Sequence, residues 1–156
     1  MPRKFLVVVD DSPEFEGALR YAARRARSTG GRLVMLRVIP PAAPDAHWSG
    51  VREEIERQTR AEAEAILNRW AAEAGERAGS TPMLLIERGE PQDCIRKVVG
   101  EDADIKILVL ASGEGGRGPG PLVTALVKQG AAFTGRKLPV TIVPGELTEK
   151  DIEDLA

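Results

Sequence analysis

Five short apolar segments recur along the chain, and each is nearly continuous rather than alternating with polar residues. They are residues 5–9 (FLVVV), 32–38 (RLVMLRV), 83–87 (MLLIE), 105–111 (IKILVLA) and 139–143 (PVTIV). Unbroken runs of leucine and β-branched residues are typical of strands that are buried on both faces, as in a parallel sheet covered by helices. The pattern therefore predicts five parallel strands.

The segments between these strands have the period of amphipathic helices. The first helix is predicted to begin at Ser12 as N-cap, with Pro13 at the first helical position, and to end at Gly30. Its buried face is expected to be Phe15, Leu19, Ala22 and Ala26. Further helices are predicted over 51–78, 91–100 and 121–133. The helix predicted over 51–78 has an apolar stripe that starts at Val51 and Ile55.

Strands that alternate with helices are joined by right-handed crossovers, which predicts an α/β fold. We expect a doubly wound five-stranded parallel sheet in the order 3-2-1-4-5, with helices on both faces. The strand order reverses between strands 1 and 4, and ligands bind at such a switch point, outside the carboxyl ends of the strands. The predicted crevice lies between Asp10-Asp11 and the loop 111–120.

This loop is rich in glycine, and residues 113–118 (GEGGRG) satisfy the spacing G-x-G-x-x-G. A dinucleotide site also needs an acidic residue about 20 positions further on, but residues 115–145 contain no Asp or Glu. A Walker A loop is excluded because Pro121 follows Gly120 and Arg136 follows Gly135. Two interpretations remain open: an anion site made by backbone N–H groups, a helix N-terminus and Arg117, or a flexible connection.

Opposite the loop, a carboxylate at the end of strand 1 has three candidate roles. It can accept hydrogen bonds from a ribose or a base edge, ligate a metal, or help to cap the first helix. Capping accounts for one of Asp10 and Asp11 but hardly requires both, so we expect Asp10 to face the crevice.

Composition narrows the classes of protein. The chain has 156 residues, 42% of them hydrophobic, which suits one domain over 1–145 followed by an acidic tail, 146–156. A net charge of −2 gives no overall positive electrostatic field of the kind that attracts nucleic acid. The apolar segment near the N-terminus is too short for a signal peptide or a membrane span. The single cysteine, Cys94, excludes an intramolecular disulfide and is predicted to be buried. We therefore expect a cytoplasmic protein that binds neither nucleic acid nor membrane.

Three segments together resemble the universal stress protein family. Residues 5–40 are similar to the opening of that family, with a strand, Asp, Ser, a helix and a second strand ending in valine. Residues 88–112 resemble its middle signature, in which Gly-x-Pro starts a helix, and residues 138–145 its closing Pro-Val strand. The resemblance implies an adenine nucleotide alpha hydrolase-like fold, a homodimer and a role in stress adaptation without enzymatic activity.

The resemblance also implies a site for ATP or another adenine nucleotide, with Mg²⁺ as candidate metal. Asp10 and Val38 match the positions that hold adenine and ribose, and the family's phosphate loop has the form G-x2-G-x9-G-[ST]. Gly113 and Gly116 fit the first spacing, but the third glycine falls on Leu126; aligned directly on strand 4, Ala111 and Glu114 replace the first two glycines. The predicted site residues are Asp10, Asp11, Val38, Ala111, Ser112, Gly113, Gly116, Arg117, Gly118, Gly120 and Thr124.

Two other classes of protein compete with this interpretation. A phosphorelay receiver domain has a similar acidic pair, but it needs an Asp after strand 3, where this chain has Glu87. A protein-interaction module without a nucleotide would pair the edge of strand 5, Pro139 to Val143, in a homodimer. Neither His47 nor any other residue is predicted to be catalytic.

Overall fold

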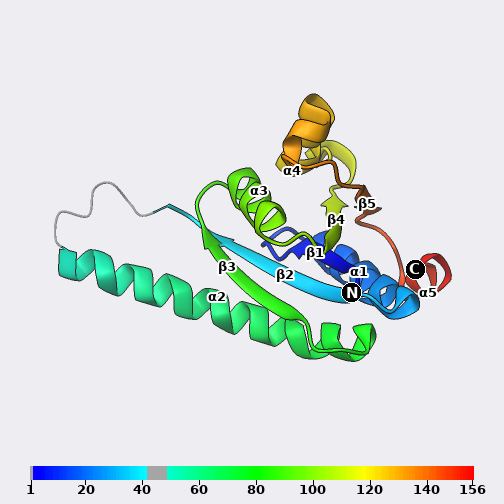
Figure 1. Cartoon of the computed structure of the whole chain (residues 1–156), viewed down its shortest axis with the longest axis horizontal. Helices are drawn as coiled ribbons and strands as arrows, with labels where there is room; N and C mark the ends of the chain where they lie inside the picture. The colour runs from blue at the N-terminus through cyan, green and yellow to red at the C-terminus, as the bar shows by residue number, and fades with distance from the viewer. Residues whose placement is uncertain (1, 42–48) are drawn as a thin grey trace.

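The computed structural model describes residues 2–41 and 49–156, apart from the side chains of Ser49 and Arg117; His47 and Trp48 lie outside the described residues. The sheet has the order β3-β2-β1-β4-β5, and all four pairings are parallel (Figure 1). The strands are β1 (Lys4–Val8), β2 (Arg32–Ile39), β3 (Met83–Arg88), β4 (Ile105–Ser112) and β5 (Val140–Pro144). The predicted fold class and strand order are confirmed.

Helices cover both faces of the sheet, and the two faces hold separate apolar cores. The helices are α1 (Phe15–Thr29), α2 (Ser49–Ala78), α3 (Pro91–Glu101), α4 (Pro121–Gln129) and α5 (Glu149–Leu155), with short 3-10 turns η1 (Gly115–Arg117) and η2 (Gly130–Phe133). Successive side chains of a strand point to opposite faces. In β1, Phe5 and Val7 therefore pack with α1 and α2, whereas Leu6 and Val8 pack with α3 and α4. This is why β1 is apolar at every core position.

None of the described helices is long and apolar enough to cross a membrane.

The start of α1 differs from the prediction. The helix begins at Phe15, so Pro13 precedes it, and no side-chain hydrogen bond caps this end in the described structure. The hydroxyl of Ser12 instead donates to Oδ1 of Asp10 at 2.6 Å. Ser12 is not the N-cap because the helix starts later than predicted, which puts Glu14 at the N-cap position, and both the hydroxyl and the backbone N–H of Ser12 donate to Asp10.

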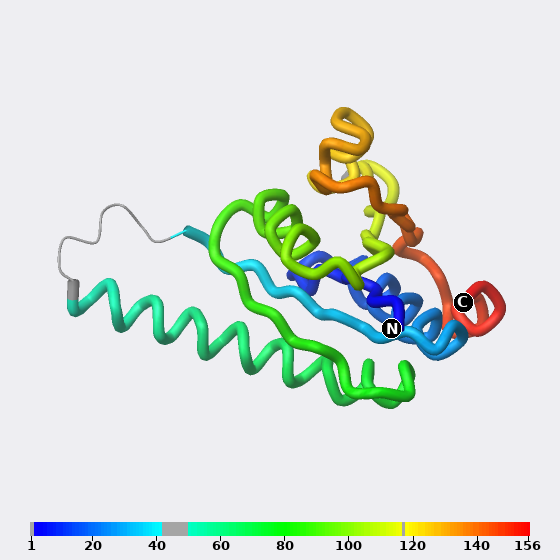
Figure 2. Tube along the Cα trace, in the orientation of Figure 1, coloured from blue at the N-terminus to red at the C-terminus, as the bar shows by residue number. Residues whose placement is uncertain are grey.

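The N-terminal turns of α2 extend beyond the sheet, as Figure 2 shows. Ala63, Leu67 and Ala74 of the predicted stripe are buried, but Val51 and Ile55 are each 51% exposed. The periodic pattern correctly identified the helix. It did not show that the helix is longer than the sheet it covers.

The predicted helix 121–133 is interrupted near its end. The α-helix α4 stops at Gln129, and Gly130, with φ of +57°, leads into η2. The positive φ favours glycine at this position. The break places Phe133 in the core below α3, where it is fully buried.

The acidic tail forms α5, which lies beside α1 of its own chain (Figure 2). A capping box between Thr148 and Asp151 starts this helix, and Ile152 is buried. Glu149 pairs with Arg77 at 3.0 Å, and Glu153 pairs with Arg24 at 3.1 Å. The residues that the sequence marked as an appended tail therefore pack against the helical layer of the domain.

The surroundings of Asp102 and Cys94 shift the pKa values of both groups. Lys4 donates a 2.7 Å hydrogen bond to Asp102, which holds the pKa of that carboxyl below its ordinary value. Burial raises the pKa of the Cys94 thiol, which keeps it in the neutral form. Cys94 is buried, as the sequence predicted.

Candidate functional site

A crevice opens at the carboxyl ends of β1 and β4, where the strand order reverses. The two strands pair directly, and residues that follow them line one cavity of about 460 Å³. Cavities of this size are usual for small-molecule sites. The structure therefore has a cavity at the predicted location of the site, between the ends of strands 1 and 4.

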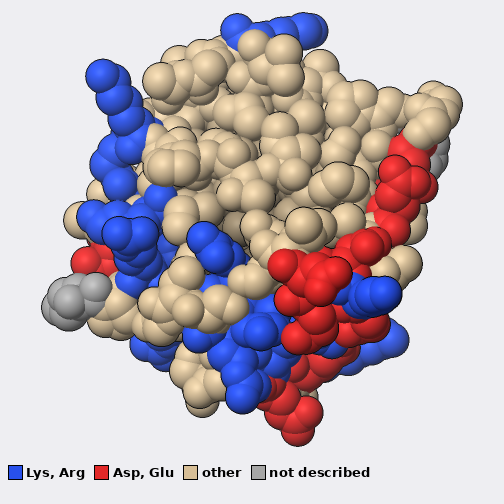
Figure 3. All heavy atoms as spheres, turned by 90° about the vertical axis from the view of Figure 1, so that its right-hand side faces the viewer, with Lys and Arg blue, Asp and Glu red and all other residues tan. Residues whose placement is uncertain are grey.

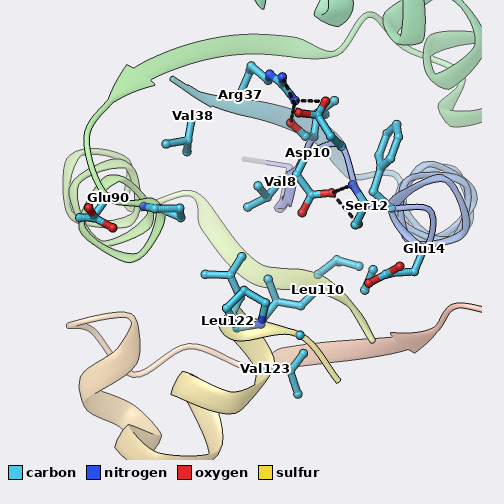
Figure 4. Close-up of a pocket in the computed structure, with 18 of the residues that line it drawn as sticks. Val8, Asp10, Ser12, Glu14, Arg37, Val38, Glu90, Leu110, Leu122 and Val123 are labelled. Carbon is cyan, nitrogen blue, oxygen red and sulfur yellow. Dashed lines mark hydrogen bonds and ion pairs between the residues drawn. The ribbon is translucent and has the colours of Figure 1, made fainter. Parts of the chain in front are cut away.

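The walls of the crevice are mostly apolar (Figure 4). Val8 comes from β1, Val38 from β2, Leu110 from β4, and Leu122 and Val123 from the first turn of α4. Prolines 40, 41, 91, 119 and 121 add further rigid apolar surface. A flat apolar group, such as a nucleobase, fits walls of this kind.

Asp10 lies at the rim and is held in one orientation. Its Oδ1 accepts hydrogen bonds from the Ser12 backbone N–H at 2.9 Å and from the Ser12 hydroxyl at 2.6 Å. Both bonds are drawn in Figure 4. They leave Oδ2 as an acceptor for a donor on a ligand, such as a sugar hydroxyl.

Arg37 is a lining residue that the sequence analysis did not single out. Its Nη1 and Nη2 donate to the two carboxylate oxygens of Asp11 at 3.1 and 3.3 Å, and Nη1 also donates to the Val9 carbonyl at 3.1 Å. The Arg37 side chain is 15% exposed, whereas that of Asp11 is 85% exposed. Its buried Nε–H has no partner in the described structure. Asp11 is thus tied to Arg37, and Asp10 is the strand-1 carboxylate that stands apart from this pair.

The glycine-rich loop folds on itself rather than around the crevice. The Gly113 N–H donates to the Pro119 carbonyl at 3.2 Å, and the Gly118 N–H donates to the Gly115 carbonyl at 3.1 Å. A Cβ on Gly113 would lie 2.5 Å from the Gly118 carbonyl oxygen, so glycine is required there by close backbone approach. Among the glycines of this loop, Gly120 lines the crevice.

Ser112 and Gly113 line a second, open hollow on the β5 side. Its other lining residues are Glu114, Gly115, Ile142, Pro144 and Glu146. Two carboxylates at this surface repel an anion.

The remaining predicted residues are placed as follows. Thr124 is exposed, and its hydroxyl donates to the Gly120 carbonyl at 2.8 Å. Gly116 and Gly118 lie in or beside η1 and line neither hollow, and the Arg117 side chain is outside the described structure. The crevice therefore brings together five of the predicted residues: Asp10, Asp11, Val38, Ala111 and Gly120.

Sequence reasoning missed Glu14, Arg37 and Glu90 as lining residues. The sequence contains a signal for two of these residues, Arg37 and Glu90. Arg37 is the one charged residue in the carboxyl-terminal half of β2, and Glu90 follows the end of the neighbouring strand β3. Residues just past the ends of parallel strands meet at one edge of the sheet.

Within the described residues, no group of three His, Cys, Asp or Glu is arranged to hold a metal ion.

A doubly wound sheet with an apolar crevice at its switch point, and an aspartate after its first strand, defines an α/β protein of the adenine nucleotide alpha hydrolase-like fold. The profile of the universal stress protein family matches residues 1–123. The chain belongs to this family. The sequence matches no curated protein significantly.

Several solved structures share the fold. Universal stress protein UspA from Lactobacillus plantarum is 18% identical, with a TM-score of 0.68 over 91% of this chain and 96% of that chain. A universal stress protein in complex with cAMP is also 18% identical, with a TM-score of 0.62 over 93% and 98% of the two chains. The universal stress protein from Archaeoglobus fulgidus in complex with dAMP is 22% identical, with a TM-score of 0.53 over 90% and 97%.

Proposed function

We propose that this protein acts in stress adaptation by binding an adenine nucleotide in the crevice between β1 and β4, without transforming it. The observation that carries the proposal is the combination of an apolar cavity of about 460 Å³ with the oriented carboxylate of Asp10 at its rim. The cAMP and dAMP complexes of proteins with this fold support adenine as the base.

The residues of the crevice suit the parts of such a ligand. The adenine ring packs between Val38 and Leu110, and a ribose hydroxyl donates to Oδ2 of Asp10. Mg²⁺, when bound with a phosphorylated ligand, would be held by one or two carboxylates at the rim and by phosphate oxygens. Asp10 and Glu14 are the candidates for that role.

Binding of AMP measured by isothermal titration calorimetry tests the proposal. Asp10→Asn keeps an oxygen that accepts from Ser12 but removes the charge, and we expect it to weaken binding about tenfold because a charge-assisted hydrogen bond is lost. The matched control is Asp154→Asn, an exposed carboxyl on α5, which should leave the affinity unchanged. The proposal fails if no adenine compound binds the unmodified protein.

Chromatography of ATP after incubation with the protein tests the absence of turnover. Formation of ADP in proportion to the amount of protein would contradict the proposal that the nucleotide is not transformed.

A second candidate function is a homodimeric interaction module that pairs through the β5 edge. In the described sheet β5 pairs with β4 alone, and its Ile142 is 41% exposed. Figure 3 shows the side of the molecule that carries β5 and α5, with a broad area free of charged side chains above the acidic residues. An exposed apolar edge strand is a template for pairing with a second chain.

We expect Ile142→Glu to shift this protein from dimer to monomer, because the dimer would bury a carboxylate without a partner. Light scattering coupled to size-exclusion chromatography measures the mass. Val51→Glu, at an exposed aliphatic position on α2, is the control and should leave the mass unchanged. A monomeric unmodified protein, or a dimer that survives Ile142→Glu, would show that this edge is not the interface.

A further inference from the structure

Asp10 can recognise a ligand only if its carboxylate is held in a fixed position relative to the crevice. Its bonds from the backbone N–H and the hydroxyl of Ser12 are local, because the two residues are two positions apart. These bonds orient the carboxylate within its own loop. They do not by themselves fix that loop relative to the sheet.

Arg37 links the loop to the sheet, because it belongs to the neighbouring strand β2. Its Nη1 donates to the Val9 carbonyl at 3.1 Å, and Nη1 and Nη2 donate to the two carboxylate oxygens of Asp11 at 3.1 and 3.3 Å. Val9 and Asp11 are the residues on either side of Asp10 in the chain. One guanidinium therefore holds both neighbours of Asp10 (Figure 4).

Arg37 makes these contacts from the face of the sheet opposite to Val38, because successive side chains of a strand alternate between faces. Met35 of β2 lies in the same core as Val9, on the side of α1 and α2. Leu36 and Val38 belong to or pack against the other core, on the side of α3 and α4. Arg37 therefore supports the loop without occupying the apolar wall that Val38 forms.

The bond to the Val9 carbonyl is the stronger of the two attachments. Val9 is fully buried, whereas the Asp11 side chain is 85% exposed. Water weakens an ion pair at the surface, but a charged donor on a buried carbonyl is shielded from this competition. The Val9 carbonyl is part of the peptide bond to Asp10, so the main attachment lies directly beside the residue that faces the crevice.

We propose that Arg37 is a positioning residue that makes the crevice selective for ligands with ribose hydroxyls. The inference rests on the proposed function, since it concerns the same site and the same ligand. Arg37 acts through the loop and not by touching the ligand. It holds Oδ2 of Asp10 where a ribose hydroxyl can donate to it, so the carboxylate does not have to be ordered when the ligand binds.

Calorimetric titrations of the full chain with AMP and dideoxy-AMP test the inference, because the second compound lacks the ribose hydroxyls. The ratio of their dissociation constants measures the selectivity for these hydroxyls. We expect dideoxy-AMP to bind the unmodified protein about tenfold more weakly, the loss typical of one hydrogen bond to a charged group. Arg37→Ala is expected to lower this ratio several-fold, because the carboxylate is no longer preorganised.

A second background separates positioning from a general effect on the fold. If Arg37 acts through the Asp10 carboxylate, adding Arg37→Ala to Asp10→Asn has no further effect on the ratio. The matched control is Arg32→Ala, at the amino end of the same strand. Arg32 also donates to a carbonyl, that of Thr81 at 3.1 Å, but does not line the crevice, so the ratio should stay unchanged.

Arg37→Lys keeps the inference testable if Arg37→Ala does not fold. Lysine retains the charge but lacks the planar fork that reaches Val9 and Asp11 together. It is expected to give a ratio between those of the unmodified protein and Asp10→Asn. Thermal unfolding verifies that each variant is folded.

An equal loss of affinity for both compounds in Arg37→Ala would show that Arg37 only supports the fold, and would overturn the inference. A ratio near one in the unmodified protein, an unchanged ratio in Arg37→Lys, or a further drop in the Asp10→Asn background would also overturn it. In each of these cases AMP still binds, so the proposed function stands. If no adenine compound binds the unmodified protein, the proposed function and the inference fail together.

Discussion

Replacing Phe133 by alanine is expected to lower the free energy of unfolding by about 3 to 5 kcal/mol, the usual cost of removing a buried aromatic ring. Phe133 is fully buried in the core between the sheet and the helices α3 and α4. It shares this core with Ile95, Val98, Leu108 and Val123. A close-packed core relaxes only partly around a deleted ring, so the variant loses contacts as well as buried apolar area.

Urea unfolding followed by circular dichroism measures this loss as a lower midpoint at unchanged slope. The expected loss is a large part of the total stability of a domain, which is about 5 to 15 kcal/mol. Val127→Ala, at an exposed position on α4, is the control and should change stability by less than about 0.5 kcal/mol. A loss below about 1 kcal/mol for Phe133→Ala would mean that η2 does not anchor the second core.

Replacing Arg136 by alanine is expected to cost about 2 to 4 kcal/mol, because partly buried carbonyls lose a charged donor. Nη2 of Arg136 lies 3.0 Å from the Val99 carbonyl oxygen, 3.3 Å from that of Asp102 and 2.9 Å from that of Ile105. These carbonyls belong to the end of α3 and the start of β4, where a cation also interacts favourably with the helix dipole. Arg136 therefore links the segment before β5 to the α3–β4 connection.

The neighbouring residue provides the matched control for this prediction. Lys137 is exposed, and Lys137→Ala should change the free energy of unfolding by less than about 0.5 kcal/mol. Arg136→Lys retains the charge but not the planar guanidinium, so an intermediate loss is expected. Equal urea midpoints for Arg136→Ala and Lys137→Ala would show that the three carbonyl contacts contribute little.

Arg136 also illustrates a feature near the site that the sequence did not predict, the direction in which a charged side chain points. Residues 115–145 carry positive charges only, and an anion site near the glycine-rich loop was one of the two interpretations that this segment left open. In the structure, Arg136 donates to carbonyls around α3. Lys128 and Lys137 do not line the crevice. The sign of the charge could be read from the sequence, but the direction in which each side chain points could not.

The sequence by itself determined the architecture and the position of the crevice. Unbroken apolar runs identify doubly buried strands, helical periods identify the connections, and the fixed hand of crossovers leaves one economical order for five strands. Asp10 and Ala111 line the crevice as the switch-point argument predicted, because the ends of parallel strands meet at one edge, and Val38, which the family resemblance implied, lines it too. All of these inferences depend on local patterns and on chirality, which a linear sequence contains.

Only the tertiary structure decided which polar groups meet. The pairs Arg37 with Asp11, Arg77 with Glu149, and Arg136 with the Val99 carbonyl join residues that are 26, 72 and 37 positions apart. The same holds for the loop that closes through Gly113 and Pro119, and for α5, which packs on its own chain. A hydrogen bond or ion pair requires contact within a few ångströms, and no local pattern fixes which distant side chain comes that close.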